Sequence, residues 1–306
     1  MTNRRSRLAP VARRSLDYGT VRQGLTDVTI RQALVDARRT LAEAGVDDPG
    51  FEAEVLLRDL LAKDRARFYL DIGDPLSPAQ QAGLRRRIER RLDGEPTAYI
   101  LGRREFYGRD FLVGPDVLVP RPETELLVEQ TLAAAREYQA PRIAEVGTGS
   151  GAVAVSLALE LPSATVYATD LSPRALEVAA ANCKRHGVAE QVVLLAGDLL
   201  DPVSVNIDIV AANLPYVATA ELPRTVPVSR EPRLALDGGN DGLDQVRRLC
   251  RQVAERQPGV SRLLLEIGQG QAGPLVDFLH RLLPGAGVEF FADLAGIDRV
   301  CSVRLP

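Results

Sequence analysis

The pattern that most restricts the fold is a regular alternation of short apolar runs and helical runs in the second half of the chain. Five runs rich in Val, Ile, Leu and Ala suit strands, at residues 142–146, 164–170, 192–198, 207–213 and 262–268. Helical runs occupy several of the gaps, notably 151–161, 172–186 and 241–257. This alternation predicts a parallel sheet with right-handed crossovers and helices on both faces.

The end of the chain follows a different pattern. The last two extended runs, VEFFADLAG and DRVCSVRL, have no helical run between them, so we expect them to pair antiparallel at the sheet edge. The expected fold class is therefore α/β, with a mostly parallel, Rossmann-like sheet of seven strands ending in an antiparallel edge hairpin. The expected domain covers residues 122–306.

The first 121 residues divide into three further segments. Residues 1–24 are rich in arginine and predict a disordered basic tail, with a targeting peptide as the alternative. Residues 25–102 carry apolar side chains at helical spacing, and Ser77-Pro78 is a typical helix start, so a small all-helical domain is expected. Residues 103–121 contain two short extended runs around Gly108, which predict a β-hairpin linker.

Composition argues against several classes of protein. The 38 basic and 41 acidic residues nearly balance, unlike those of a general nucleic-acid-binding protein. With two histidines and three separated cysteines, neither a zinc site nor a disulfide framework is expected, which suits a cytoplasmic protein without metal. No apolar run reaches the roughly 18–20 residues that a membrane-spanning helix requires.

A glycine-rich turn joins the first strand to the next helical run, in the sequence RIAEVGTGSGAVAVSLALEL. Gly147, Gly149 and Gly151 allow a tight turn and a close approach of a ligand to the backbone, and the helix start favours electron-rich groups. The following strand ends at Asp170, which is placed to accept both ribose hydroxyls of a nucleoside. These features alone fit a dinucleotide, S-adenosylmethionine or a plain strand-to-helix turn.

Three details favour S-adenosylmethionine as the cofactor. The spacing is GxGxG, an imperfect match to the GxGxxG turn that seats a pyrophosphate. Glu145 precedes the first glycine by two residues and can face the ammonium of a methionine moiety, and Asp198 ends a third strand, where it can reach an adenine amino group. The predicted cofactor-binding residues are Glu145, Gly147, Thr148, Gly149, Ser150, Gly151, Asp170, Asp198, Leu199 and Asn213.

The segment Asn213-Leu214-Pro215-Tyr216 follows the fourth strand and so reaches the same rim of the sheet. The side-chain carbonyl of Asn213 and the backbone carbonyl of Leu214 can accept the two N–H groups of a planar NH2, against which the Tyr216 ring can lie. No strong base is needed, since a sulfonium methyl is very reactive and the orientation of the two reactants contributes most of the rate enhancement. Asn213, Pro215 and Tyr216 are the predicted catalytic residues, and an ordinary Asn-x-Pro turn is the alternative.

Two other functional classes are compatible with a glycine-rich turn in an α/β domain. A dehydrogenase would require a nicotinamide pocket, and a silent binding module would bind the donor without turnover.

The run LRRRIERRL predicts either a solvated helix face or a docking surface for an acidic protein or ribosome-associated RNA. DGGNDG lacks the ligand spacing of a calcium-binding EF-hand and predicts a turn, and EIGQGQ predicts a loop.

The chain resembles the protein-(glutamine-N5) methyltransferases that modify peptide-chain release factors, over about residues 29–305. The most specific element is FYGRDFLVGPDVLVPRPETELLVE, at residues 106–129, and GEPTAYILG, EPRLALDGGNDGL and DLAGIDRV are similar to other family blocks. The order of a helical substrate-recognition domain, a hairpin and a class I methyltransferase domain also matches. The resemblance implies methyl transfer from S-adenosylmethionine to the glutamine amide of a release factor's GGQ loop, a step that concerns translation termination.

The resemblance also implies an acceptor pocket. The substrate-binding residues expected on this basis are Phe106, Arg121, Glu123, Glu125, Asn213, Leu214, Pro215 and Tyr216. This chain departs from the family in one place, since Leu214 replaces the first proline of the usual Asn-Pro-Pro-Tyr. Asn-Leu-Pro-Tyr is typical of ribosomal-RNA adenine-N6 dimethylases, so an adenine of ribosomal RNA is the alternative acceptor.

Overall fold

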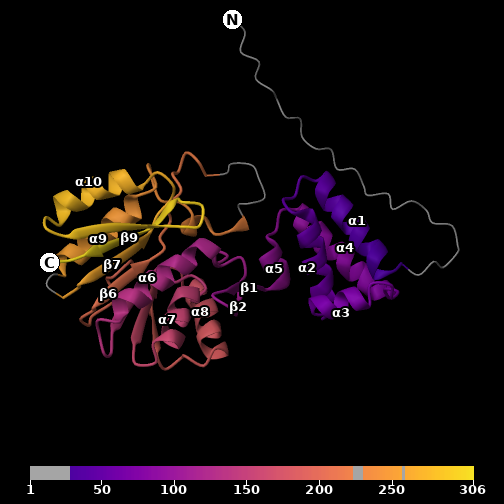
Figure 1. The fold of residues 1–306 in the computed structure, drawn as a ribbon, viewed down its shortest axis with the longest axis horizontal. Coiled ribbons are helices and arrows are strands. Elements are labelled where there is room, and N and C mark those ends of the chain that lie inside the picture. Colours follow the sequence, from indigo (N-terminus) through magenta and orange to yellow (C-terminus); the bar gives the residue numbers. More distant parts are fainter. Residues whose placement is uncertain (1–27, 223–229, 257–258) are drawn as a thin grey trace, which may run out of the picture.

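The structure is a computed structural model that describes residues 28–222, 230–256 and 259–306, so the predicted basic tail lies outside the described residues. A helical part and a larger α/β part are joined by a narrow connection (Figure 1). The helices of the first part are α1 (Ile30–Glu43), α2 (Pro49–Leu60), α3 (Arg65–Leu70), α4 (Pro78–Leu92) and α5 (Thr97–Leu101).

Capping boxes define where two of these helices begin. Ser77 precedes α4, where its hydroxyl accepts the Gln80 N–H at 3.2 Å while the Gln80 side chain accepts the Ser77 N–H at 2.8 Å. The same reciprocal pair joins Thr29 and Gln32 at the start of α1. Each box provides partners for backbone N–H groups that a helix start leaves free. The predicted helix start at Ser77-Pro78 is confirmed.

The connection between the two parts is an antiparallel hairpin followed by a packed extended segment. Strands β1 (Arg103–Phe106) and β2 (Arg109–Leu112) pair across a turn in which Gly108 has a φ of +70°. The predicted hairpin is confirmed, but strand pairing stops at Leu112. The residues beyond it instead bury Val113, Val117 and Val119 with side chains of α5 and of the α/β part. Apolar packing therefore fixes the linker.

The α/β part contains a seven-stranded sheet in the order β5-β4-β3-β6-β7-β9-β8, as the alternation predicts. The strands are β3 (Arg142–Val146), β4 (Thr165–Asp170), β5 (Val192–Ala196), β6 (Ile209–Ala212), β7 (Arg262–Glu266), β8 (Gly287–Ala292) and β9 (Asp298–Arg304). The first five pair in parallel, and β9 runs antiparallel to both β7 and β8. The predicted antiparallel edge is therefore confirmed.

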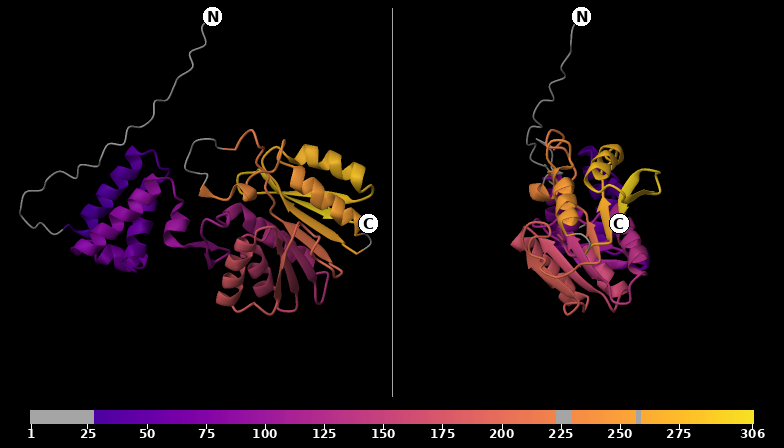
Figure 2. Two further views of the ribbon diagram at one scale, coloured as in Figure 1. Left: turned by 180° about the vertical axis from the view of Figure 1, so that it is seen from behind. Right: turned by 90° about the vertical axis from the view of Figure 1, so that its left-hand side faces the viewer.

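Helices cover both faces of this sheet (Figures 1 and 2). They are α6 (Glu125–Ala135), α7 (Ala152–Glu160), α8 (Pro173–Arg185), α9 (Asp244–Glu255) and α10 (Ala272–Leu282), with the short 3-10 helices η1 (Pro122–Thr124) and η3 (Arg233–Ala235). Buried residues of α6, α7 and α8 share one core cluster, and those of α9 and α10 share another. The sheet is thus buried on both sides, as parallel sheets require.

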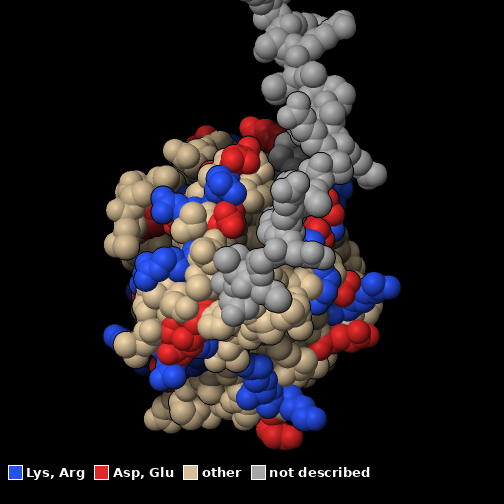
Figure 3. Space-filling model, turned by 90° about the vertical axis from the view of Figure 1, so that its right-hand side faces the viewer, with Lys and Arg blue, Asp and Glu red and all other residues tan. Residues whose placement is uncertain are grey.

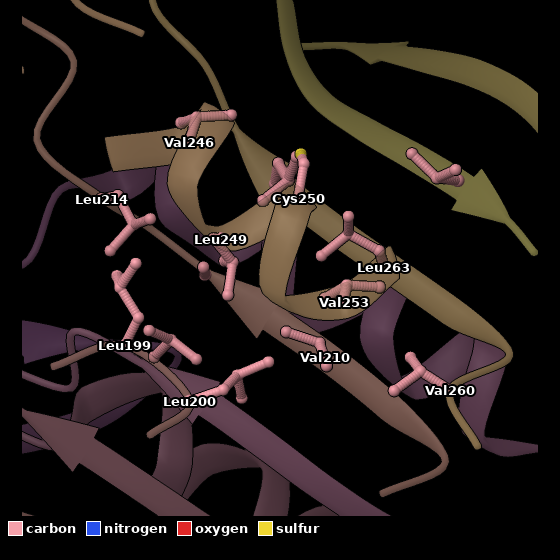
Figure 4. Packing of buried hydrophobic residues seen from close by; sticks show 14 of the residues in the cluster. Leu199, Leu200, Val210, Leu214, Val246, Leu249, Cys250, Val253, Val260 and Leu263 are labelled. Atoms are coloured by element: carbon pink, nitrogen blue, oxygen red, sulfur yellow. The ribbon is translucent and has the colours of Figure 1, made fainter. Parts of the chain in front are cut away.

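The core beneath α9 reaches the carboxyl ends of the strands (Figure 4). Leu249 and Val253 of α9 lie over Val210 of β6, and Leu199 and Leu214 lie at one end of the same cluster. These two leucines belong to segments that were predicted to form the site. Within the described ranges, no helix has the length and apolar character needed to cross a membrane.

Candidate active site

A cavity of about 720 Å³ opens at the carboxyl ends of β3, β4, β5 and β6. Open α/β sheets bind their ligands at this end of the strands. The wall consists of residues 145–150, 169–172, 197–199, 213–215 and 232–235, together with Thr219, Asp237, Gly239 and parts of the linker, η1, α7, α8 and α9. The structure therefore brings the predicted donor turn and the predicted acceptor segment to one cavity.

Strand register explains why these two segments meet. Val146 of β3 pairs with Ala212 of β6, so the next residues, Gly147 and Asn213, lie side by side. A Cβ atom built on Gly147 would lie 3.2 Å from Leu214 Cδ2 and 3.6 Å from the Asn213 carbonyl oxygen. The absence of a side chain at Gly147 therefore lets the acceptor segment pack directly on the donor turn.

The glycine turn is held by backbone hydrogen bonds to the neighbouring strand. The N–H groups of Gly147 and Thr148 both donate to the Thr169 carbonyl at 2.9 Å. Gly147, Gly149 and Gly151 have φ values of +78°, +52° and +77°, in the left-handed region that favours glycine. Thr148, Gly149 and Ser150 line the cavity, whereas Gly151 directly precedes α7 as its N-cap and packs against α8.

The two predicted aspartates of the donor side both line the cavity, but their partners differ. Asp170 accepts the Gly149 N–H at 2.9 Å and the Ser172 N–H at 2.8 Å, so its carboxylate orientation is fixed by the backbone. Asp198 forms an ion pair with Arg248 of α9. Leu199 follows it with a φ of +49° and lines the cavity beside it.

Glu145 is a buried carboxyl group in the cavity wall, with 1% of its surface exposed. Burial raises its pKa to about 8, the Asp170 charge adds to this shift, and the Thr148 hydroxyl opposes it. Its Oε2 atom has no hydrogen-bond partner in the structure. Because an unpartnered buried carboxyl oxygen is costly, this atom is suited to receive a cationic ligand group.

On the acceptor side, Asn213 has a partner that the sequence analysis did not identify. Its Nδ2 donates a hydrogen bond to Thr124 Oγ1 at 3.0 Å, and Thr124 is buried at the end of η1. Since the NH2 end of the carboxamide is occupied, its Oδ1 atom remains as the acceptor. Asn213, Leu214 and Pro215 all line the cavity.

Tyr216 lies outside the set of residues that line the cavity. It is half-buried, its backbone carbonyl accepts Gln271 Nε2 at 2.9 Å, and burial raises the pKa of its phenol, with the charge of Glu266 adding to the shift. Gln271 belongs to the predicted EIGQGQ loop, which therefore supports the Asn213–Tyr216 segment from behind.

The remaining expected substrate-binding residues divide into two groups. Phe106 and Arg121 line the cavity, and Arg121 is held by a 2.5 Å ion pair with the buried carboxylate of Glu231. Glu123 and Glu125 are not among the lining residues. Glu125 accepts the N–H of Tyr107 at 2.9 Å and so supports the hairpin turn, while Glu123 is exposed.

Three buried polar residues support the site and were missed by the sequence analysis. The side-chain NH2 group of Asn182 in α8 donates to the Ser150 carbonyl at 2.8 Å and to the Leu112 carbonyl, and its Oδ1 atom accepts the Leu112 N–H. Asn182 therefore connects the donor turn to the hairpin. Glu231 also accepts the Val119 N–H at 3.0 Å. Glu266 is the last residue of β7, and the same strand-end position that identified Asp170 could have identified it.

The DGGNDG segment packs against the backbone of the acceptor motif. A Cβ atom on Gly238 would lie 2.6 Å from the carbonyl oxygens of Pro215 and Gly242, and one on Gly242 would lie 2.2 Å from the Tyr216 carbonyl oxygen. Only glycine permits this approach. The acids of the segment pair with neighbouring arginines, Asp241 with Arg247 of α9 at 2.6 Å and Asp237 with Arg233 of η3 at 3.1 Å. In the described part of the chain, no cluster of three or more His, Cys, Asp or Glu side chains could hold a metal ion.

Replacing Gly238 with alanine is expected to lower the free energy of unfolding by about 1–3 kcal/mol, because the new methyl group meets backbone oxygens that cannot move aside. Urea denaturation measures this change. The new methyl group should also displace the Pro215 backbone, so we expect turnover to fall as well. Gly73→Ala is the matched control, since its Cβ would meet nothing within 4 Å. Equal stability of the two variants would contradict this packing.

The arginine-rich run forms the later part of α4, and three of its five arginines form ion pairs within the helical part. Arg87 pairs with Asp59 at 2.8 Å, Arg90 with Glu95 at 2.6 Å and Arg91 with Glu52 at 2.5 Å. The face of the molecule that carries the helical part shows positive and negative side chains intermixed (Figure 3). The ion pairs favour the interpretation of a solvated helix face.

Comparison with known proteins follows the same division of the chain. Residues 32–102 match a family model described as the PrmC N-terminal domain, and residues 122–227 match one described as the methyltransferase small domain. A release factor glutamine methyltransferase of Moorella thermoacetica is 43% identical over 274 residues, which are 89% of this chain and 97% of that protein. Proteins with the same name from Geobacter sulfurreducens and Bacillus subtilis are 41% and 35% identical, each over 90% of this chain and at least 97% of the relative.

Solved structures share the fold at much lower identity. The catalytic domain of hMettl16, solved in complex with a hairpin of the MAT2A 3'UTR, has a TM-score of 0.53 and 15% identity, covering 64% of this chain and 77% of that one. A delta-N METTL16 methyltransferase domain has a TM-score of 0.51 and 14% identity, with 65% and 90% covered. At this identity, the likeness shows a methyltransferase fold for the α/β part.

Proposed function

Because the chain belongs to the family of release factor glutamine methyltransferases, we propose that it methylates the side-chain amide nitrogen (N5) of the glutamine in a release factor's GGQ motif. S-adenosylmethionine is the methyl donor. The observation that carries this proposal is the single cavity in which the glycine turn and Asn213 adjoin.

The donor side of the cavity fits S-adenosylmethionine. We assign the glycine turn and Asp170 to the nucleoside, Glu145 to the methionine ammonium, and Asp198 with Leu199 to the adenine. The unpartnered Oε2 of Glu145 supports the second assignment, since an ammonium group would satisfy it. When bound, the donor supplies a methyl group activated by the positive charge on sulfur.

The acceptor side fits a planar amide. We assign Asn213 Oδ1 and the Leu214 carbonyl to the two N–H groups of the glutamine, with Pro215, Phe106 and Arg121 around it. These groups hold the nitrogen in place and leave its lone pair toward the donor, so positioning carries most of the rate enhancement. Tyr216, Glu123 and Glu125 lie outside the residues that line the cavity, so no direct contact with the amide is assigned to them.

The alternative acceptor, an adenine of ribosomal RNA, is not favoured. Relatives that match about nine tenths of the chain are named for glutamine methylation, and this match includes the helical part. Leu214 itself packs against Gly147 within the hydrophobic core, where it is 4% exposed. Packing therefore explains the leucine at this position, and its presence is no evidence for an RNA acceptor.

The proposal extends to organisation and place of action. We assign residues 25–102 to substrate recognition, residues 103–121 to the linker and residues 122–306 to methyl transfer. The enzyme would act in the cytoplasm, without metal or membrane, and would meet the release factor free or near the ribosome.

The test uses radiolabelled S-adenosylmethionine with a release factor that carries either GGQ or GGA at the loop tip. We expect label in the GGQ protein only. A parallel reaction with ribosomal RNA separates the alternative, because label in RNA and not in protein would show an adenine acceptor. Equal labelling of the two release factors would refute glutamine as the acceptor.

A further inference from the structure

A buried carboxyl group lies behind Asn213, on the side away from the donor turn. Ala212 of β6 pairs with Leu265 of β7, so the next residues, Asn213 and Glu266, are neighbours across the sheet. Glu266 is 2% exposed and is not among the residues that line the cavity. Any effect of Glu266 on the site must therefore pass through other side chains.

Thr124 and Asn213 are the side chains that connect Glu266 to the cavity. Asn213 Nδ2 donates to Thr124 Oγ1 at 3.0 Å. Both side chains lie close enough to Glu266 to lower the pKa of its carboxyl group, whose Oε2 atom has no hydrogen-bond partner in the structure. Thr124 and Asn213 both line the cavity. Thr124 of η1, Glu266 of β7 and Asn213, which follows β6, thus form a polar cluster beside the cavity.

The chemistry of these groups gives the network a direction. An ionised carboxylate accepts hydrogen bonds and has none to donate. The Thr124 hydroxyl already accepts from the Asn213 NH2 group, so its own proton is free to be donated toward the unpartnered Oε2 atom of an ionised Glu266. The Asn213 Oδ1 atom then faces the cavity. A flipped carboxamide would instead turn its own NH2 group toward the NH2 group of the substrate, and the two sets of N–H donors would repel each other.

We infer that Glu266, acting through Thr124, is a positioning residue that fixes which end of the Asn213 carboxamide faces the acceptor. This inference rests on the proposed function only in naming the acceptor as an amide. It assigns roles to Glu266 and Thr124, neither of which is part of the predicted donor or acceptor sites.

The charge state of Glu266 provides a readout that packing alone would not affect. Burial raises its pKa to about 7, and the Glu123 charge of η1 adds to the shift. Thr124, the Arg299 charge of β9 and Asn213 oppose it, and Tyr216 also lies close to this carboxyl group. Protonated Glu266 can donate to Thr124, so the direction of the network is lost as the pH falls below about 7.

The first test compares Thr124→Val with Thr124→Ser. Thr124→Val is expected to lower kcat by about ten- to a hundredfold, the scale of a displaced reacting group, with KM for the release factor and donor affinity changed by less than about threefold. Thr124→Ser, which keeps the hydroxyl, should restore kcat to within about threefold. Thr131→Val is the matched control, since Thr131 is also buried but donates to the Leu127 carbonyl within α6.

The second test follows pH. Wild-type kcat is expected to rise as pH increases through about 7, and Glu266→Gln should lower kcat and remove this limb of the profile. A wild-type profile without the limb, an unchanged limb in Glu266→Gln, or full activity in Thr124→Val would overturn the inference. Absence of wild-type activity on the GGQ protein would instead refute the proposed function.

A third measurement does not need the acceptor. In NMR spectra of the wild-type protein, the side-chain NH2 signals of Asn213 should shift as Glu266 titrates, and this shift should vanish in Thr124→Val. Signals that ignore both the pH and the substitution would show that Asn213 is oriented by other groups and would overturn the inference even if the acceptor were not glutamine.

Discussion

Replacing Asn213 with alanine is expected to lower turnover by at least about a hundredfold, or about 3 kcal/mol, while donor binding is retained. The variant removes the oxygen assigned to one N–H of the acceptor, whereas the donor is assigned mainly to the glycine turn, Glu145 and Asp170. Single-turnover methylation gives the rate, and calorimetric titration with S-adenosylhomocysteine gives the donor affinity.

Asn240→Ala is the control for this variant, because Asn240 is exposed and is not among the residues that line the cavity, although Asp237 and Gly239 of the same segment are. Its turnover should match that of the wild-type protein. If Asn213→Ala also keeps wild-type turnover, the acceptor is held by other groups, and the assignment of Asn213 Oδ1 is wrong.

Donor binding is expected to release a proton and to strengthen with pH, by up to about tenfold per pH unit between roughly pH 5 and 8. Burial raises the pKa of Glu145 to about 8, so most of the ligand-free protein carries a protonated Glu145 at pH 7. The ammonium assigned to this carboxyl group favours its ionised form. Calorimetric titration in two buffers of different ionisation enthalpy measures the released proton.

Glu145→Gln should abolish this proton release, and Glu266→Gln is the matched control because it replaces another buried carboxyl group of raised pKa outside the cavity lining. Proton release that persists in Glu145→Gln would assign the ammonium to a different group. An unchanged donor affinity across this pH range would contradict the contact itself.

The same group makes the stability of the ligand-free protein depend on pH. In the folded state the raised pKa keeps the proton on Glu145, whereas the unfolded chain releases it near pH 4.5. Folding therefore binds a proton between about pH 5 and 8, and stability falls as pH rises, by on the order of 5 kcal/mol for this group. Urea denaturation should show a shallower pH dependence in Glu145→Gln.

Local sequence patterns were sufficient to predict the fold. The alternation after Arg142 predicts the parallel sheet because period and length differ between strands and helices, and the missing helix before DRVCSVRL predicts the antiparallel edge. Ser77 marks a helix start because its hydroxyl caps a free backbone N–H group, and Gly108 marks a turn because a residue without a Cβ atom adopts a positive φ readily. The strand-end positions of Asp170, Asp198 and Asn213 predict their meeting at one rim, since parallel strands share their carboxyl edge.

What the sequence by itself determined was thus the set of elements and the edge at which Gly147, Asp170 and Asn213 meet. The tertiary structure alone decided the partners of these residues, because register and packing join positions that are distant in the chain. The register of β6 with β7 places Glu266 behind Asn213, and η1 brings Thr124 to the same amide. Packing of separate segments likewise turned Glu125 to the hairpin and left Tyr216 outside the cavity.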